Sequence, residues 1–437
     1  MATDAGNPIP RFPAGFLWGV STSAHQIEGA ADEREASVWD VFTAEPGRVK
    51  DGSTAAVACD HYHRYREDVA LLADLGVDAY RFSVSWPRVN SPGGLDFYDR
   101  LVDELCAAGV RPVPTLFHWD LPASLDWLER DTAARFADHV SVVAERLGDR
   151  VTKWITLNEP AEHTLLGHAL GAHAPGRQLL FDALPVAHHQ LLAHGLAVQA
   201  LRATGATDIG IANSHGPTWP ASAEPADQEA AGFYDLLLNR LFAEPILLGA
   251  YPEGIGELMP GDVSADLKVI SEPIDWYGVN YYAPTRVGAP QGTEIEFGGL
   301  TMPAELPFSV REIEDRPVTD FGWPVVPEGL TELLTTFRDR YGDRLPPVVI
   351  TENGCSYEGV DDQDRIAYLD GHVRALHAAL ESGVDVRGYF VWSLMDNFEW
   401  AEGYARRFGL VHVDYETQRR TPKASYHWFR DVLRAQR

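Results

Sequence analysis

Strand-like and helical patterns alternate eight times along the 437 residues of this chain. The strand-like runs are short, apolar and rich in β-branched or aromatic residues. They cover residues 16–20, 79–84, 110–117, 151–157, 209–213, 274–280, 348–351 and 387–392. Helical patterns follow them at residues 65–75, 97–108, 132–147, 184–203, 229–242, 327–341 and 363–382, and a last one at 423–435 closes the chain. A helix after each strand demands parallel pairing, so eight such units predict an α/β fold with a closed (β/α)8 barrel, a TIM barrel.

The alternation runs through the whole chain and therefore predicts one domain, residues 1–437, with an N-terminal tail at 1–11. An open, doubly wound sheet is the competing architecture, but no glycine-rich turn for a dinucleotide or phosphate follows an early strand. A long segment rich in Gly and Pro, residues 283–326, follows the sixth strand. Long loops at the carboxyl ends of barrel strands usually build the active site, and we expect this segment to do so.

Composition limits the partners and the location. The chain has 64 acidic and 36 basic residues and a formal charge of −28, which would repel nucleic acid and anionic membrane surfaces. Three widely separated cysteines, no apolar leader and no apolar run of about 18 residues predict a soluble, cytoplasmic protein. No cofactor or metal is expected, and the sequence leaves the oligomeric state open.

Two glutamates stand where predicted parallel strands end. Glu159 lies in Thr-Leu-Asn-Glu-Pro after the fourth strand, and Glu352 lies in Ile-Thr-Glu-Asn-Gly after the seventh. Breaking an acetal requires a proton donor for the leaving oxygen and an anion on the other face of the sugar ring. One carboxyl group must therefore be neutral and the other ionised, which predicts glycosidic bond chemistry for this pair.

The other strand ends offer hydrogen-bonding side chains interleaved with aromatic rings. A pyranose needs both, because its hydroxyl groups donate and accept while its C–H faces stack on rings. The residues at these ends are Gln26, Arg81, His118, Trp119, Asn158, Asn280, Tyr282, Trp392, Glu399 and Trp400. A barrel brings all of them to one rim.

These motifs resemble those of glycoside hydrolase family 1, the retaining β-glucosidase family. The similarity covers about residues 12–429 with the motifs in the family's order, at residues 80–88, 117–122, 156–160, 280–282, 350–354 and 392–400. The resemblance implies that Glu159 is the general acid and base and Glu352 the nucleophile of a double displacement through a covalent glycosyl-enzyme. It implies Arg81 and Tyr282 as the groups that hold the nucleophile. Retention further implies carboxyl groups roughly 5 to 5.5 Å apart.

The remaining matched positions imply sugar recognition. The implied substrate-binding residues are Gln26, His118, Trp119, Asn158, Asn280, Trp392, Glu399, Trp400 and Phe408. The resemblance implies that Asn158 binds the 2-hydroxyl of the sugar and that the sugar ring stacks on Trp392. Trp323 resembles the family's aglycone-side platform, although an ordinary packed tryptophan explains it about as well.

The resemblance predicts an exo-acting β-glucosidase for small β-glycosides or oligosaccharides, with β-galactosides and β-fucosides as further candidate substrates. Three alternatives stay open: a catalytically silent carbohydrate-binding protein, a transglycosylase and a 6-phospho-β-glycosidase. Glu399 disfavours the last, because phospho-specific members carry serine there, and a carboxylate would repel a 6-phosphate. A short loop at 86–97 and Ala161, where the family often has Trp, leave the aglycone undetermined.

Overall fold

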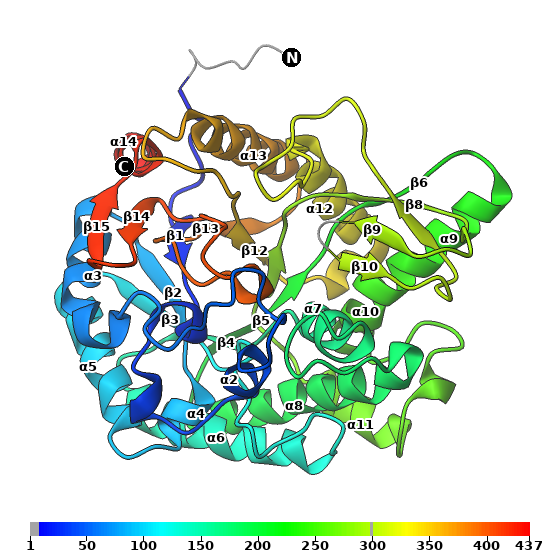
Figure 1. Cartoon of the computed structure of the whole chain (residues 1–437), viewed down its shortest axis with the longest axis horizontal. Helices are drawn as coiled ribbons and strands as arrows, with labels where there is room; N and C mark the ends of the chain where they lie inside the picture. The colour runs from blue at the N-terminus through cyan, green and yellow to red at the C-terminus, as the bar shows by residue number, and fades with distance from the viewer. Residues whose placement is uncertain (1–7, 298–299) are drawn as a thin grey trace.

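The computed structural model describes residues 8–297 and 300–437. Most of the predicted tail, residues 1–7, and positions 298–299 of the long segment lie outside the described residues. Within the described residues, eight parallel strands close into a barrel in the order β1-β13-β12-β7-β5-β4-β3-β2 (Figure 1). The predicted (β/α)8 fold is therefore confirmed.

All eight predicted strands form, with ends that differ by a few residues from the prediction. They are β1 (Leu17–Ser21), β2 (Ala79–Ser83), β3 (Arg111–Thr115), β4 (Lys153–Asn158), β5 (Asp208–Ser214), β7 (Tyr277–Asn280), β12 (Val348–Asn353) and β13 (Val386–Trp392). Most of these residues are buried on both sides, since the interior of the barrel lies on one face and helices on the other.

The barrel interior is a packed core. Each strand, or the residue just before it, contributes one apolar side chain to a single cluster: Leu17, Ala79, Val113, Ile155, Ala212, Trp276, Val349 and Phe390. Glycines make room for its two large rings. A Cβ on Gly19 would lie 2.3 Å from the ring of Phe390, and one on Gly210 would lie 2.5 Å from Trp276. The interior is therefore filled at this level, and a ligand can enter only at the rim.

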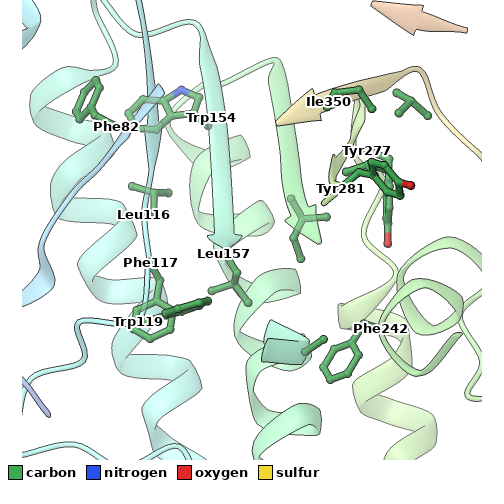
Figure 2. Close-up of a cluster of buried hydrophobic side chains, with 14 of the residues drawn as sticks. Phe82, Leu116, Phe117, Trp119, Trp154, Leu157, Phe242, Tyr277, Tyr281 and Ile350 are labelled. Atoms are coloured by element: carbon green, nitrogen blue, oxygen red, sulfur yellow. The ribbon is translucent and has the colours of Figure 1, made fainter. Parts of the chain in front are cut away.

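A second apolar layer joins the strands to the surrounding helices. Figure 2 shows part of it, with Trp154 and Leu157 on β4, Phe82 on β2, Leu116 directly after β3, and Phe242 on the helical side. The principal helices are α3 (His61–Leu75), α5 (Gly94–Ala107), α6 (Asp131–Leu147), α8 (Leu184–Ala203), α11 (Val263–Ile270), α12 (Pro327–Tyr341), α13 (Gln363–Glu381) and α14 (Ala424–Gln436). None of the described helices is both long and apolar enough to cross a bilayer.

The helix predicted at 229–242 forms, but it begins earlier, ends later and contains a π-helical turn. The chain forms α9 (Pro225–Asp235), a π-helical segment (Leu236–Arg240) and α10 (Leu241–Leu248) without a break. The wide turn lets the side chain of Asn239 donate to the carbonyl of Gly216 at 3.0 Å and accept from His215 at 3.0 Å. These contacts tie the helix to the chain that follows β5, which local periodicity does not reveal.

The long segment 283–326 is not irregular throughout. It contains β8 (Thr285–Gly288), β9 (Ile295–Phe297), β10 (Leu300–Met302) and β11 (Ser309–Arg311). β8 pairs with β11 and with β6 (Thr218–Pro220), and β9 pairs with β10. Figure 1 shows β6, β8, β9 and β10 beside α9 and α10, outside the barrel wall.

Candidate active site

The carboxyl ends of the barrel strands surround a cavity of about 490 Å³. Ten of the fourteen predicted site residues line it: His118, Trp119, Glu159, Tyr282, Trp323, Glu352, Trp392, Glu399, Trp400 and Phe408. The other four, Gln26, Arg81, Asn158 and Asn280, are fully or almost fully buried and bonded to residues of the wall. The structure thus brings together residues that are as far as 373 positions apart in the chain.

Glu352 is held through both of its carboxyl oxygens. Arg81 Nη1 donates to Oε1 at 2.5 Å, and the Tyr282 hydroxyl donates to Oε2 at 2.7 Å. The pairing of β12 with both neighbouring strands shifts register between Ile350 and Asn353. Such irregularities re-aim side chains at the end of a strand, and here the shift includes the position of Glu352.

Glu159 begins the short helix α7 (Pro160–Glu162) directly after β4. Its backbone has a φ of 46°, in the left-handed region that a residue with a side chain adopts at a cost of about 1 to 3 kcal/mol. Its N–H donates to the carbonyl of Ala212 at 2.7 Å, which fixes this turn against β5. The surrounding barrel therefore imposes the direction of the side chain.

Asn280 and Asn158 connect the two glutamates. Asn280 Nδ2 donates to Glu159 Oε1 at 2.8 Å and to Asn158 Oδ1 at 3.0 Å, and its own Oδ1 accepts from Thr351 at 2.6 Å. Arg81 Nη2 also donates to Asn158 Oδ1. Because Asn158 Oδ1 receives two donors, its Nδ2 faces His118 Nε2 at 3.1 Å. One buried network thus orients both carboxyl groups.

The two carboxyl groups differ in their electrostatic environment. Burial raises the pKa of Glu159 well above its usual value, and the nearby charges of Glu352 and Glu162 raise it further. Burial also raises the pKa of Glu352, but the Arg81 cation and the Tyr282 hydroxyl counteract it. Of the two carboxyl groups, Glu159 therefore holds the proton and Glu352 is ionised.

One end of the cavity is built around Gln26 and Glu399. Gln26 Nε2 donates to Glu399 Oε2 at 3.2 Å and to Asn397 Oδ1 at 3.0 Å, and its Oε1 accepts from Ser23 at 2.6 Å. Burial, followed by the charge of Glu352, raises the pKa of Glu399 to about 8. Both side chains are positioned before any ligand arrives.

Aromatic rings form the wall beside this polar end. The His118 ring lies between Trp392 and Trp400, with centroids 5.8 Å and 5.9 Å away. Trp119 packs on Trp400 at 4.7 Å and donates its indole N–H to the carbonyl of Asn158 at 3.0 Å. Burial, with the charge of Arg81, lowers the pKa of His118 well below its usual value, so its ring is neutral. Its Nδ1 is buried and has no hydrogen-bond partner among the described residues.

The long segment supplies another part of the cavity wall. Trp323 stacks on Phe321 at 4.3 Å and lies 5.3 Å from Tyr282 and 6.0 Å from Phe408, measured between ring centroids. The residues of segment 283–326 that line the cavity are Ala283, Pro284, Thr285, Leu300, Phe321, Trp323 and Pro324. Trp323 is thus part of the cavity wall.

Several residues of the wall were not predicted from the sequence, among them Glu162, His173, Tyr234 and Phe321. Glu162 could have been found, because positions three apart on a helix face the same side and Glu159 opens this helix. Tyr234 comes from α9, outside the barrel, and no local signal marks it. Among the described residues, no group of three or more His, Cys, Asp or Glu side chains is arranged to hold a metal ion.

Comparison with known proteins agrees with this geometry. The family model of glycosyl hydrolase family 1 matches residues 9–437. β-Glucosidase A of Thermotoga maritima is 42% identical over 98% of both chains, and a bifunctional β-D-glucosidase/β-D-fucosidase of Bifidobacterium breve is 42% identical over 97% of this chain and 98% of its own. The crystal structure of a psychrophilic β-glucosidase from Micrococcus antarcticus superposes with a TM-score of 0.93 at 44% identity, covering 99% of this chain and all of the other. The chain therefore belongs to glycosyl hydrolase family 1.

Proposed function

We propose that this protein is an exo-acting, retaining β-glucosidase with Glu159 as acid and base and Glu352 as nucleophile. The observation that carries the proposal is the pair of buried carboxyl groups in unlike environments: Glu352 is bonded to a cation and a phenol, and Glu159 is bonded to a neutral amide. The family and the β-glucosidase activity named for its relatives support the same reaction.

The geometry supports two steps. Glu352 attacks the anomeric carbon while Glu159 gives its proton to the leaving glycosidic oxygen, which yields a glycosyl ester on Glu352 and a free alcohol. Glu159, now ionised, then removes a proton from a water molecule whose oxygen attacks the same carbon, and Glu352 leaves as a carboxylate. The bonds that fix Glu352 leave it little freedom to reorganise as charge moves.

The hydroxyl groups of the sugar would meet the polar end of the cavity. We assign Gln26, Glu399 and the unpartnered His118 Nδ1 to hydroxyl recognition, and Trp392 and Trp400 to the apolar face. The naming of one relative as both glucosidase and fucosidase supports tolerance at the sugar's outer positions. Trp323 and Phe321 would face the aglycone.

A 6-phosphoglycoside remains the less supported substrate. With its pKa at about 8, Glu399 keeps its proton over much of the neutral range, so its repulsion of a phosphate is weaker than the sequence suggested. The two cations of the cavity wall are already paired, Lys50 with Glu402 and Arg48 with Glu45. A phosphate would find no free cation among these groups.

The test of this function is a matched panel of 4-nitrophenyl β-glucoside, β-galactoside, β-fucoside and 6-phospho-β-glucoside. We expect turnover of the neutral sugars, with the glucoside and fucoside leading, and a first-formed product of β configuration by NMR. A first-formed product of α configuration, or turnover of the phosphosugar alone, would contradict the proposal. No turnover of any of the four substrates would favour a carbohydrate-binding protein.

The pH dependence of kcat/KM should be bell-shaped. Activity falls as pH rises through the raised pKa of Glu159, because the acid loses its proton, and it falls as pH drops through the pKa of Glu352, because the nucleophile gains one.

Since the charge of Glu162 contributes to the raised pKa of Glu159, Glu162→Gln should move the alkaline limb of the pH profile to lower pH. Glu402→Gln removes a carboxyl group of the same cavity wall and should leave the alkaline limb where it lies in the unmodified protein. An equal shift of this limb in both variants would refute the role of Glu162.

We also propose a reducing compartment, the cytoplasm, as the location. Cys59, Cys106 and Cys355 are all free thiols, and Cys106 is exposed. An exposed thiol persists best where disulfides do not form readily.

A further inference from the structure

The strand end that carries Glu352 is held from behind by the next residue, Asn353. This side-chain amide is fully buried and uses both hydrogens that it can donate: Nδ2 donates to the carbonyl of Tyr281 at 2.8 Å and to the Tyr368 hydroxyl at 3.1 Å. Its Oδ1 accepts from the Tyr389 hydroxyl at 2.7 Å. These partners lie directly after β7, on α13 and on β13. Asn353 therefore ties β12 to both neighbouring strands and to a helix of the outer layer.

The Tyr368 hydroxyl also reaches a second strand end. It donates to the carbonyl of Tyr282 at 3.3 Å while it accepts from Asn353. Tyr282 is the residue whose own hydroxyl donates to Glu352 Oε2 at 2.7 Å. One phenol of α13 thus contacts the residue that follows Glu352 and the backbone of the residue that bonds to the Glu352 carboxyl group.

Tyr282 lies beyond the regular hydrogen bonds of the sheet. β7 ends at Asn280, and the N–H of Tyr281 still donates to the carbonyl of Glu352 at 2.9 Å. The chain then leaves the barrel and continues to β8. The bond from Tyr368 therefore holds the backbone of Tyr282 at the point where strand pairing no longer does.

Packing alone does not explain the hydroxyl group of Tyr368. The ring is buried and stacks on His372, with the two centroids 3.9 Å apart, and a phenylalanine ring would pack in the same way. Taking a hydroxyl group out of water costs free energy unless it is bonded in the folded chain, and both bonds of this one go to strand ends of the active site. Burial raises the pKa of this phenol well above its usual value, so it stays a donor over the pH range of an assay.

We propose that Tyr368 is a positioning residue that acts on Glu352 through the hydrogen bond between Tyr282 and Glu352. Its bonds to both strand ends fix the separation of these two residues, so that the phenol of Tyr282 stays directed at the carboxylate. Tyr368 itself does not line the catalytic cavity. The inference rests on the proposed β-glucosidase function and adds a helix residue to the groups that keep the nucleophile ionised.

The expected effect on Glu352 follows from the groups around it. The charged and titratable groups that face it come from four strand ends and are Arg81, Glu159, Tyr282 and Glu399. Burial raises the pKa of Glu352, and the Arg81 cation and the Tyr282 hydroxyl lower it. A longer bond from Tyr282 would therefore raise the pKa of Glu352. Since the nucleophile must be ionised, activity on the acid side would then be lost at a higher pH.

The test is Tyr368→Phe, which keeps the ring and removes the hydroxyl group. We expect the acid limb of the kcat/KM profile on 4-nitrophenyl β-glucoside to move to higher pH. At the optimum kcat/KM should fall about two- to tenfold, the factor that one hydrogen bond contributes. Competitive inhibition by glucose should be unchanged, because the hydroxyl-binding end of the cavity is untouched.

Tyr426→Phe is the matched control. Its hydroxyl group also belongs to a buried tyrosine on an outer helix and donates to a backbone carbonyl, that of Leu71 at 2.7 Å, but α14 supplies no residue of the catalytic cavity. This variant should lower the unfolding temperature and leave the acid limb in place. An unmoved acid limb in Tyr368→Phe, or an equal shift in Tyr426→Phe, would overturn the proposal.

A double-mutant cycle tests the route of the effect. Tyr282→Phe removes the phenol that donates to Glu352 and should move the acid limb further than Tyr368→Phe does. Adding Tyr368→Phe to Tyr282→Phe should then produce no additional shift, because the bond through which Tyr368 acts is already absent. Shifts that simply add would overturn the proposal.

Infrared difference titration provides a readout that does not depend on turnover. The spectrum of Glu352→Gln, subtracted at each pH, isolates the carboxyl band of Glu352. The midpoint of its protonation should lie at higher pH in Tyr368→Phe than in the unmodified protein or in Tyr426→Phe. An unchanged midpoint would overturn the role of Tyr368 and leave the β-glucosidase proposal standing. A raised midpoint in a protein that hydrolyses no glycoside would support that role and contradict the β-glucosidase proposal alone.

Discussion

Replacing Glu352 with Gln is expected to lower kcat on 4-nitrophenyl β-glucoside by at least about 10⁴-fold, as loss of a nucleophile does in other covalent mechanisms. The amide cannot form the glycosyl ester and cannot balance the positive charge that develops on the sugar ring. Gln is close to Glu in size, so Arg81 and Tyr282 keep a partner of the same shape. Circular dichroism and thermal unfolding should therefore show an intact fold.

A smaller variant at the same position separates the chemical role from a structural one. In Glu352→Gly, azide should enter the vacated space, restore turnover of an activated glucoside and give a product of α configuration. Glu402→Gln removes a carboxyl group of the same wall and should keep activity within about tenfold. Full activity in Glu352→Gln, or a rescued product of β configuration, would remove Glu352 from the role of nucleophile.

The second large effect is expected for Glu159→Gln, and its size should depend on the leaving group. Alkyl glucosides need protonation of the departing oxygen, so kcat/KM should fall about 10²- to 10⁴-fold, the range of general acid catalysis. 2,4-Dinitrophenol leaves without a proton, so formation of the glycosyl-enzyme should stay fast. Its hydrolysis should become slow, because no base activates water. Stopped-flow measurements should then show a burst followed by slow turnover.

Glu162→Gln is the matched control for this variant. Its carboxyl group lies one helical turn away and lines the same cavity, yet it has no assigned part in proton transfer. At a pH below the alkaline limbs of both enzymes, it should show no burst followed by slow turnover with dinitrophenyl glucoside, and any loss of activity should not depend on the leaving group. The same pattern in both variants would mean that the turn, rather than Glu159, controls the chemistry.

The barrel could be predicted because the hydrophobic periodicity of each strand and helix is a local pattern, and this pattern recurs eight times along the sequence. Eight apolar runs separated by helical patterns allow few arrangements other than a closed parallel barrel, and all eight strands formed where they were predicted. The helix predicted at 229–242 formed, but its π-helical turn could not be predicted, for the opposite reason. Its π-helical interruption depends on contacts of Asn239 with His215 and Gly216, which belong to another part of the chain.

The sequence by itself determined the barrel and the residue types at its rim, because both follow from short patterns that parallel strands bring to one edge. Tertiary structure alone decided how those residues act. It placed Arg81 against Glu352 and an amide against Glu159. Two side chains of the same type therefore differ in pKa, and the proton lies on Glu159. Tertiary structure also brought two π-helical segments from separate parts of the chain together with strands of the long segment. Charge interactions and apolar burial depend on distances of a few ångströms between remote residues, and only the folded chain sets those distances.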